Sequence, residues 1–141
     1  MAGLMDWAMA RLEEGTATVR ELLSAPRLPF DESLRSRLPE RHGIYSIYSR
    51  NAAPGEILRA GRTKTAAGGL RQRIYSNHLM GNQPGNLRAQ LVRDGACKNL
   101  EEAKLWLQGH CTVQFVVIED AKARCWAEHF MLSILRPKYS D

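Results

Sequence analysis

The chain has 141 residues, of which 44% are hydrophobic and 25% are charged, a composition typical of one globular domain with a single core. Lysine and arginine total 20 against 15 for aspartate and glutamate, so the net charge is +5 and the sequence pI about 9.4. This mild basic excess favours a polyanionic partner without requiring one, because many basic proteins bind no nucleic acid.

Three cysteines stand far apart, at Cys97, Cys111 and Cys125. Their odd number and wide spacing argue against a CxxC metal pair and a closed disulfide framework, so we expect a reduced, cytoplasmic setting. The apolar patch at the N-terminus is interrupted by Asp6 and Arg11 and follows no basic leader, which is untypical of a secretory signal. No apolar run approaches the length of a membrane span, and we expect a soluble protein.

The first part of the chain is expected to be helical. Apolar spacing predicts two short helices, over residues 4–13 and 18–23, with a break at Gly15. Thr18 and Glu21 have the spacing of a capping box for the second helix.

The following segment, up to residue 42, carries three prolines and is predicted to be a connecting arm, in which Asp31 caps a brief helix. A β-branched and aromatic run over residues 43–49 predicts a strand, and residues 56–63 predict a second strand. Asn, Pro and Gly between these two runs favour a turn, so the pair is expected to form a hairpin.

The remaining pattern predicts four helices and one strand. Asn99 and Asp120 are placed to cap two of the helices, and the last helix is expected to end before Pro137. In chain order, the predicted elements are a helix over 70–80, a helix over 87–92, a helix over 100–110, a strand over 111–119 and a helix after residue 120.

These elements predict an α+β fold, with a small mixed three-stranded β-sheet made of the hairpin and the later strand and flanked by helices. We expect residues 39–141 to form this domain. Residues 1–38 are expected to form an N-terminal helical extension, packed on the core or beside it.

Several short motifs follow one another in an informative order. They read GIY at 43–45, RAGRT at 59–63, LRQR at 70–73, AEH at 127–129 and LRPKYS at 135–140. Taken together, this ordered set resembles the GIY-YIG nucleases. The resemblance covers the predicted domain and leaves the N-terminal extension uncovered.

The resemblance implies a GIY-YIG-like fold and a metal-dependent endonuclease that hydrolyses DNA phosphodiester bonds with a single Mg²⁺ or Mn²⁺. It implies that Glu128 binds the metal, that Tyr45 activates water, and that Arg73 holds the phosphate, assisted by His78 or Arg62. Five basic residues are expected to contact the DNA backbone: Arg59, Arg62, Lys64, Arg71 and Arg88.

The residue types suit this chemistry. The Glu128 carboxylate is a hard oxygen ligand, and Mg²⁺ typically keeps several waters and takes only one or two protein carboxylates. Arg73 carries a permanent charge on donors that match phosphate oxygens. Tyr45 can accept a proton from water only if nearby cations, such as Arg62 or Lys64, lower its pKa from about 10.

Each of these residues also has a structural alternative. Tyr45 would serve equally as a sheet aromatic. Arg73 lies in a basic stretch that is typical of a solvated surface, with Arg71 as its substitute in a shifted register. Glu128 could form a surface ion pair with Arg124, one helical turn away. His78, as a single histidine, could be an ordinary polar surface residue.

The chain departs from the family pattern at several positions. Arg59 and Ala60 replace the usual tyrosine and aliphatic residue, and Ser140 or Tyr139 stands in place of the usual asparagine. His78 lies one position later than expected, with Asn77 in its place. These substitutions motivate a rival hypothesis, in which the same fold is a catalytically weakened module that binds DNA or protein. A third hypothesis is an unrelated small α+β domain. The oligomeric state is a separate question, and a homodimer is one possibility.

Overall fold

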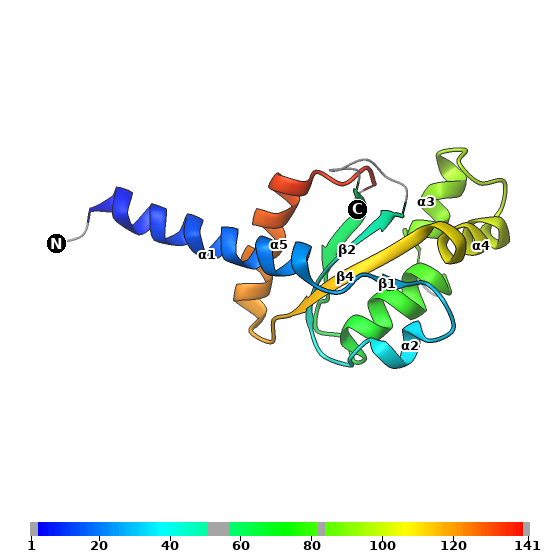
Figure 1. Cartoon of the computed structure of the whole chain (residues 1–141), viewed down its shortest axis with the longest axis horizontal. Coiled ribbons are helices and arrows are strands. Elements are labelled where there is room, and N and C mark those ends of the chain that lie inside the picture. The colour runs from blue at the N-terminus through cyan, green and yellow to red at the C-terminus, as the bar shows by residue number, and fades with distance from the viewer. Residues whose placement is uncertain (1–2, 51–56, 82–83, 140–141) are drawn as a thin grey trace.

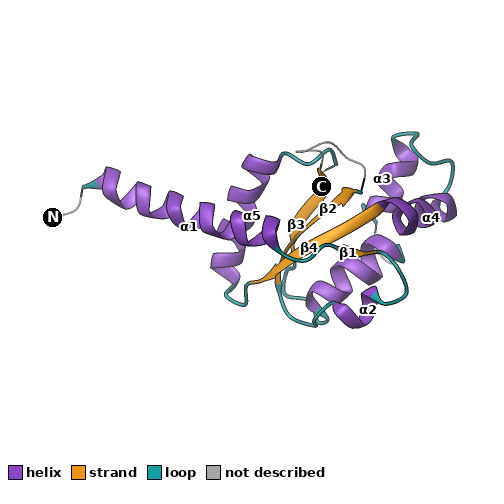
Figure 2. Cartoon of the chain, viewed as in Figure 1, coloured by secondary structure: helices purple, strands orange, loops and turns teal. Residues whose placement is uncertain are grey.

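The computed structural model describes residues 3–50, 57–81 and 84–139. It confirms the α+β class, with helices on both faces of one sheet (Figures 1 and 2). In chain order, the elements are α1 (Leu4–Ser24), β1 (Leu28–Pro29), α2 (Leu34–Arg37), β2 (Gly43–Ser49), β3 (Ile57–Arg62), η1 (Arg71–Leu79), α3 (Leu87–Arg93), α4 (Leu100–His110), β4 (Cys111–Val117) and α5 (Ala121–Leu135).

The sheet has four strands in the order β1-β4-β2-β3, and its strand pairs are antiparallel. The expectation of a mixed three-stranded sheet was therefore wrong. The additional strand, β1, comes from the predicted connecting arm, where Leu28 pairs with Val113 and Pro29 with Thr112. Two residues are too short to show a strand pattern, and an edge strand tolerates a proline because its outer side needs no N–H donor.

The N-terminal segment forms one helix, α1, rather than two. Gly15 does not end a helix: a Cβ on this residue would lie 2.7 Å from the ring of Phe130 in α5, so the glycine allows the two helices to approach closely. Thr18 is not a cap either, because its hydroxyl donates to the backbone oxygen of Glu14 within the helix.

The contact at Gly15 gives a first testable prediction. Gly15→Ala is expected to lower the free energy of unfolding, because overlap with Phe130 typically costs about 1–3 kcal/mol and exceeds the helix-propensity gain of about 1 kcal/mol. Gly109→Ala is the matched control, since a Cβ there meets nothing within 4 Å and should stabilise the protein. Urea denaturation of both variants measures the difference; equal stabilisation by the two substitutions would contradict the packing.

Most of the other predicted elements are confirmed. The Asn99 and Asp120 side chains cap α4 and α5 by accepting from backbone N–H groups, and α5 ends at Leu135, before Pro137. Most of the predicted hairpin turn, residues 51–56, lies outside the described residues. Across the described ranges, no helix is both long and apolar enough to cross a bilayer.

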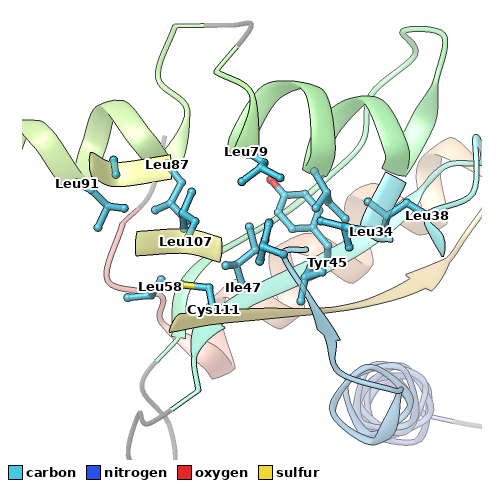
Figure 3. Packing of buried hydrophobic residues seen from close by; sticks show 14 of the residues in the cluster. Leu34, Leu38, Tyr45, Ile47, Leu58, Leu79, Leu87, Leu91, Leu107 and Cys111 are labelled. Atoms are coloured by element: carbon cyan, nitrogen blue, oxygen red, sulfur yellow. The ribbon is translucent and has the colours of Figure 1, made fainter. Parts of the chain in front are cut away.

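Strand β2, one of the two inner strands, contributes to an apolar cluster on each face of the sheet. Its successive side chains point to opposite faces. Ile44 and Tyr48 face α1 and α5, and belong to a cluster that contains Val19, Leu22 and Met131. On the other face, Tyr45 and Ile47 pack with residues of α2, η1, α3 and α4, as Figure 3 shows. Each face of the sheet thus carries its own apolar cluster, and α1 contributes Val19 and Leu22 to one of them.

Candidate active site

Tyr45 lies in the middle of β2, opposite Gly61 of β3 and Phe115 of β4. The side chain is fully buried, and Figure 3 shows its ring within the apolar cluster of that face. Its hydroxyl oxygen is 2.7 Å from Nε2 of His78 and 3.1 Å from Nε of Arg73. The tyrosine is therefore a core aromatic and also the centre of a polar group.

His78 is held as the tautomer that donates to Tyr45. The backbone N–H of Leu87 donates to Nδ1 of His78 at 3.1 Å, so Nδ1 carries no proton in the neutral ring and Nε2 does. Burial, with the positive charges of Arg59 and Arg73, holds the pKa of His78 well below its usual value, which keeps the ring neutral. Nε2–H and the Nε–H of Arg73 thus both donate to the Tyr45 oxygen.

The position of His78 in the sequence is explained by the type of helix that carries it. The segment Arg71–Leu79 is a π-helix, and at its end the N–H of Met80 donates to the oxygen of Tyr75, five residues back, at 2.9 Å. In such a helix, residues five apart lie about one turn apart on the same side. His78 is five residues after Arg73, so both side chains reach the Tyr45 oxygen. An α-helical repeat would not have placed them on the same side.

Gly61 brings Glu128 to the same place. A Cβ on Gly61 would lie 3.1 Å from the Tyr45 hydroxyl oxygen and 3.6 Å from Oε2 of Glu128. Because Gly61 has no side chain, the Tyr45 hydroxyl and the Glu128 carboxylate can both approach this position on β3. The carboxylate comes from α5, which packs across β3, so residues 83 positions apart in the sequence converge because of the fold.

Glu128 pairs with Arg62 and not with Arg124, which was the alternative partner suggested by helical spacing. Nη1 of Arg62 lies 2.5 Å from Oε1 of Glu128, and the side chains are only 24% and 15% exposed. A half-buried ion pair of this kind is stronger than an exposed one because water screens it less. Oε1 of Glu128 is thus already engaged by the guanidinium of Arg62.

A cleft of about 420 Å³ opens beside this group. Three basic residues, Arg62, Lys64 and Arg73, line it, together with polar side chains that include Gln72 and Asn77. Converging cations with a permanent positive charge favour the binding of a phosphate. Arg73 connects the two regions, because it borders the cleft and also donates to Tyr45.

Arg59 does not reach this cleft. It is 1% exposed, and its Nη1 donates to the backbone oxygen of Gly85 at 3.0 Å and to the side chain of Gln90. It also contributes to the low pKa of His78. Arg59 therefore ties β3 to α3 and supplies positive charge near the histidine.

Arg71 and Arg88 bind the protein's own backbone. Nε of Arg71 donates to the oxygen of Leu38 at 2.9 Å, and its Nη1 lies 2.6 Å from Oε1 of Glu40. Nη1 of Arg88 donates to the oxygen of Leu79 at 3.1 Å. Of the five predicted DNA-contacting residues, only Arg62 and Lys64 line the cleft among the described residues.

Sequence reasoning missed the role of Arg124. This residue is 3% exposed, and its guanidinium donates to the backbone oxygens of Thr63, Ile118 and Glu119 at 2.8–3.0 Å. It ties the loop after β3, which carries Lys64, to the helix that carries the glutamate. An arginine one turn from an acidic residue suggests an ion pair, and no sequence signal indicates that its acceptors are backbone oxygens, which include that of Lys64 at 3.4 Å.

The closing motif is described only in part. The N–H of Tyr139 donates to the oxygen of Leu58, which places the C-terminal segment along β3. The Tyr139 hydroxyl donates to Oδ2 of Asp94 at 2.7 Å and is not directed at Tyr45. Ser140, the predicted substitute for the family asparagine, lies outside the described residues.

One carboxylate, that of Glu128, lies at this site as a potential metal ligand. Among the described residues, no three His, Cys, Asp or Glu side chains are grouped to bind an ion, and the cysteines are free thiols. Zinc needs three or four protein ligands and is a poor match. A single half-buried carboxylate, Glu128, matches Mg²⁺ or Mn²⁺ that keeps most of its water.

No protein-family model, curated protein or solved structure matches this chain. The resemblance to the GIY-YIG nucleases therefore rests on the ordered motifs alone, and it remains a prediction.

The buried His78 gives a second prediction. The unfolded chain takes up a proton near pH 6.5, whereas the folded chain does not, so stability is fully present above this pH and falls as the pH drops below it. The loss should approach about 1.4 kcal/mol per pH unit. His78→Gln should remove this dependence and His129→Gln, at an exposed position, should keep it. Urea denaturation between pH 5 and 8 measures it; identical slopes in all three proteins would contradict the assignment.

Proposed function

We propose that the chain is a GIY-YIG-type endonuclease, which hydrolyses DNA phosphodiester bonds with one divalent metal ion. One observation carries the proposal: the Tyr45 hydroxyl contacts the ring of His78 and the guanidinium of Arg73, and this hydroxyl and the Glu128 carboxylate both lie beside Gly61. These residues come from three elements that are distant in the sequence. A buried tyrosine hydroxyl needs a hydrogen-bond partner, but one partner meets that need. Two nitrogen donors, with a carboxylate close by, exceed it.

Tyr45 acts as the proton acceptor. Two N–H groups, from His78 and Arg73, are directed at one oxygen, and such donors stabilise negative charge on it. A phenolate held in this way can take a proton from an attacking water. His78 is thereby a positioning residue, because its ring contacts the phenol and is buried away from the cleft.

Arg73 links the cleft to Tyr45. The phenol is buried, and Arg73 donates to its oxygen and also lines the wall of the cleft. A phosphate bound in the cleft lies beside the same guanidinium, whose charge stabilises the negative charge that develops on the phosphate in the transition state. The Nε–H of Arg73 stays on the phenol oxygen, so it continues to stabilise the phenolate.

Arg62 exchanges partners when DNA binds. Its guanidinium moves from Glu128 to a phosphate oxygen, which leaves the carboxylate available as a ligand. Mg²⁺ or Mn²⁺, when bound, supplies Lewis-acid stabilisation of the phosphate and of the leaving oxygen. Lys64, on the cleft wall, adds sequence-independent affinity for the backbone.

The experiment that tests this function is a nuclease assay on supercoiled, linear, single-stranded and branched DNA. Cleavage of at least one substrate is expected with Mg²⁺ or Mn²⁺ and none with chelator. Because the cleft binds phosphate through cations, DNA affinity should fall steeply as salt rises. A protein that binds no DNA and cuts none of the four substrates would contradict the proposal.

A second candidate function is DNA binding without cleavage. Two observations favour it: Tyr45 is fully buried, and Glu128 is already paired with Arg62 at 2.5 Å. In this case, the cleft would hold a phosphate while the ion pair stays closed. Salt-sensitive binding of DNA with no metal-dependent cleavage would identify this function.

A further inference from the structure

Apolar side chains are exposed mainly on two helices. Of the large hydrophobic residues that are exposed in the described part of the chain, most lie on α1 and α5, namely Leu4, Met5, Trp7, Met9, Leu12, Leu23, Trp126 and Ile134. Figure 1 shows that the N-terminal half of α1 projects beyond α5. Exposed apolar surface concentrated in this way is typical of an interaction site.

One part of this surface is an apolar groove of about 500 Å³ along α1. The α1 wall of the groove includes Leu12, Thr16 and Leu23, and the α5 wall is formed by Phe130 and Ile134. These α1 residues recur at intervals of four and seven, which places them on one side of the helix. The groove is thus a seam in which a second helix can lie alongside α1.

An antiparallel register centred on Thr16 would pair apolar with apolar side chains at its ends. Met9, just beyond the groove, and Leu23 each lie seven residues from Thr16, and Leu12 and Arg20 each lie four residues from it. In a pair of antiparallel helices related by a twofold axis, residues at equal distances from the centre face one another. Such a pair places Met9 of one chain opposite Leu23 of the other, with the small Thr16 at the crossing.

Charges flank the seam in a complementary way. In this register, Leu12 is covered by the aliphatic stem of Arg20 from the other chain. The guanidinium of that arginine then lies next to Glu13, which is one residue from the facing position. Both Glu13 and Arg20 are exposed on the single chain. The twofold axis repeats the contact, so each dimer gains two Glu13–Arg20 pairs.

We propose that the groove is occupied by α1 of a second copy of this chain, packed antiparallel across a twofold axis at Thr16. The pairing of Met9 with Leu23 and of Glu13 with Arg20 favours this occupant, because a surface that is complementary to itself forms a closed, isologous dimer. The inference does not depend on the nuclease activity, and it uses no residue of the cleft.

Charge reversal in the full-length chain tests the dimer by sedimentation equilibrium. Glu13→Arg places two like-charged contacts in the interface, and Arg20→Glu does the same with the opposite sign. Each variant alone should dimerise at least about tenfold more weakly than the wild type, since like charges in contact cost several kcal/mol. An equimolar mixture of the two should form heterodimers, in which both pairs are restored.

Glu14→Arg is the matched control. Glu14 lies on the same helix and is exposed, but it borders a different pocket, on the opposite side of α1. This variant should therefore dimerise like the wild type. A wild-type chain that stays monomeric at all concentrations would overturn the proposal and assign the groove to another occupant. A dimer that both reversals leave intact, or a mixture that forms no heterodimer, would overturn the antiparallel register.

Discussion

Glu128→Gln is expected to abolish metal-dependent cleavage of DNA while the protein stays folded. The substitution keeps the size of the side chain and its contact with Arg62, but it removes the charged oxygen ligand. Loss of metal-assisted stabilisation of the transition state is worth several kcal/mol, or at least about a thousandfold in rate. DNA binding should be retained or strengthened, because a negative charge beside the phosphate is removed.

Glu119→Gln is the matched control for this variant. Glu119 is also paired with an arginine, Arg41, at 2.9 Å, but both side chains are more than half exposed and lie outside the cleft. Its nicking rate on supercoiled plasmid should equal that of the wild type. Equal rates for the wild type and Glu128→Gln, in the same assay, would show that the carboxylate has no part in the reaction.

Tyr45→Phe is expected to have the second largest effect. The ring still fills the core, but the oxygen that accepts from His78 and Arg73 is lost. Removal of a general base costs about 10²–10⁴-fold in rate. A buried donor without its acceptor also costs about 1–3 kcal/mol, so the free energy of unfolding should fall.

Tyr48→Phe, on the same strand, separates the two effects. The Tyr48 hydroxyl is buried and has no hydrogen-bond partner among the described residues, and burial raises its pKa to about 12. Its removal should leave the rate unchanged and stability unchanged or higher. Plasmid nicking and urea denaturation of both variants provide the comparison. Equal activity in the two variants would assign Tyr45 a structural role alone.

The elements with strong local signals could be predicted from the sequence. The β-branched run of β2, the caps at Asn99 and Asp120, and the stop before Pro137 act within a few residues, and the structure has them where they were expected. The predicted convergence of Tyr45 with Arg73 also corresponds to a contact in the structure, because the motif order reflects strand and helix order.

What could not be predicted depends on long-range packing. Gly15 was expected to end a helix, and only the ring of Phe130, from the other end of the chain, explains why it does not. The two-residue strand β1 exists only because β4 is there to pair with it. Arg59 is indistinguishable in sequence from a DNA-binding arginine, yet its donors meet backbone and amide oxygens of α3 and the loop before it.

The π-helix Arg71–Leu79 could not be predicted from the sequence either. A sequence pattern assumes an α-helical repeat, in which Asn77 shares a side with Arg73 and His78 does not. The wider turn brings His78 onto this side as well and directs it toward Tyr45, while Asn77 still lines the cleft with Arg73. The predicted register failed here because the local geometry departs from the usual helix.

The most direct test of the account is a double-mutant comparison of plasmid nicking rates, with the wild type, Tyr45→Phe, Glu128→Gln and the double variant under saturating Mg²⁺. Groups that act as one unit in a single reaction are strongly non-additive. If Tyr45 and Glu128 belong to one active site, the wild type nicks plasmid in a metal-dependent way and the double variant is no slower than the slower single variant. Losses that multiply in the double variant, or single variants as active as the wild type, would contradict the claim that these residues form one active site.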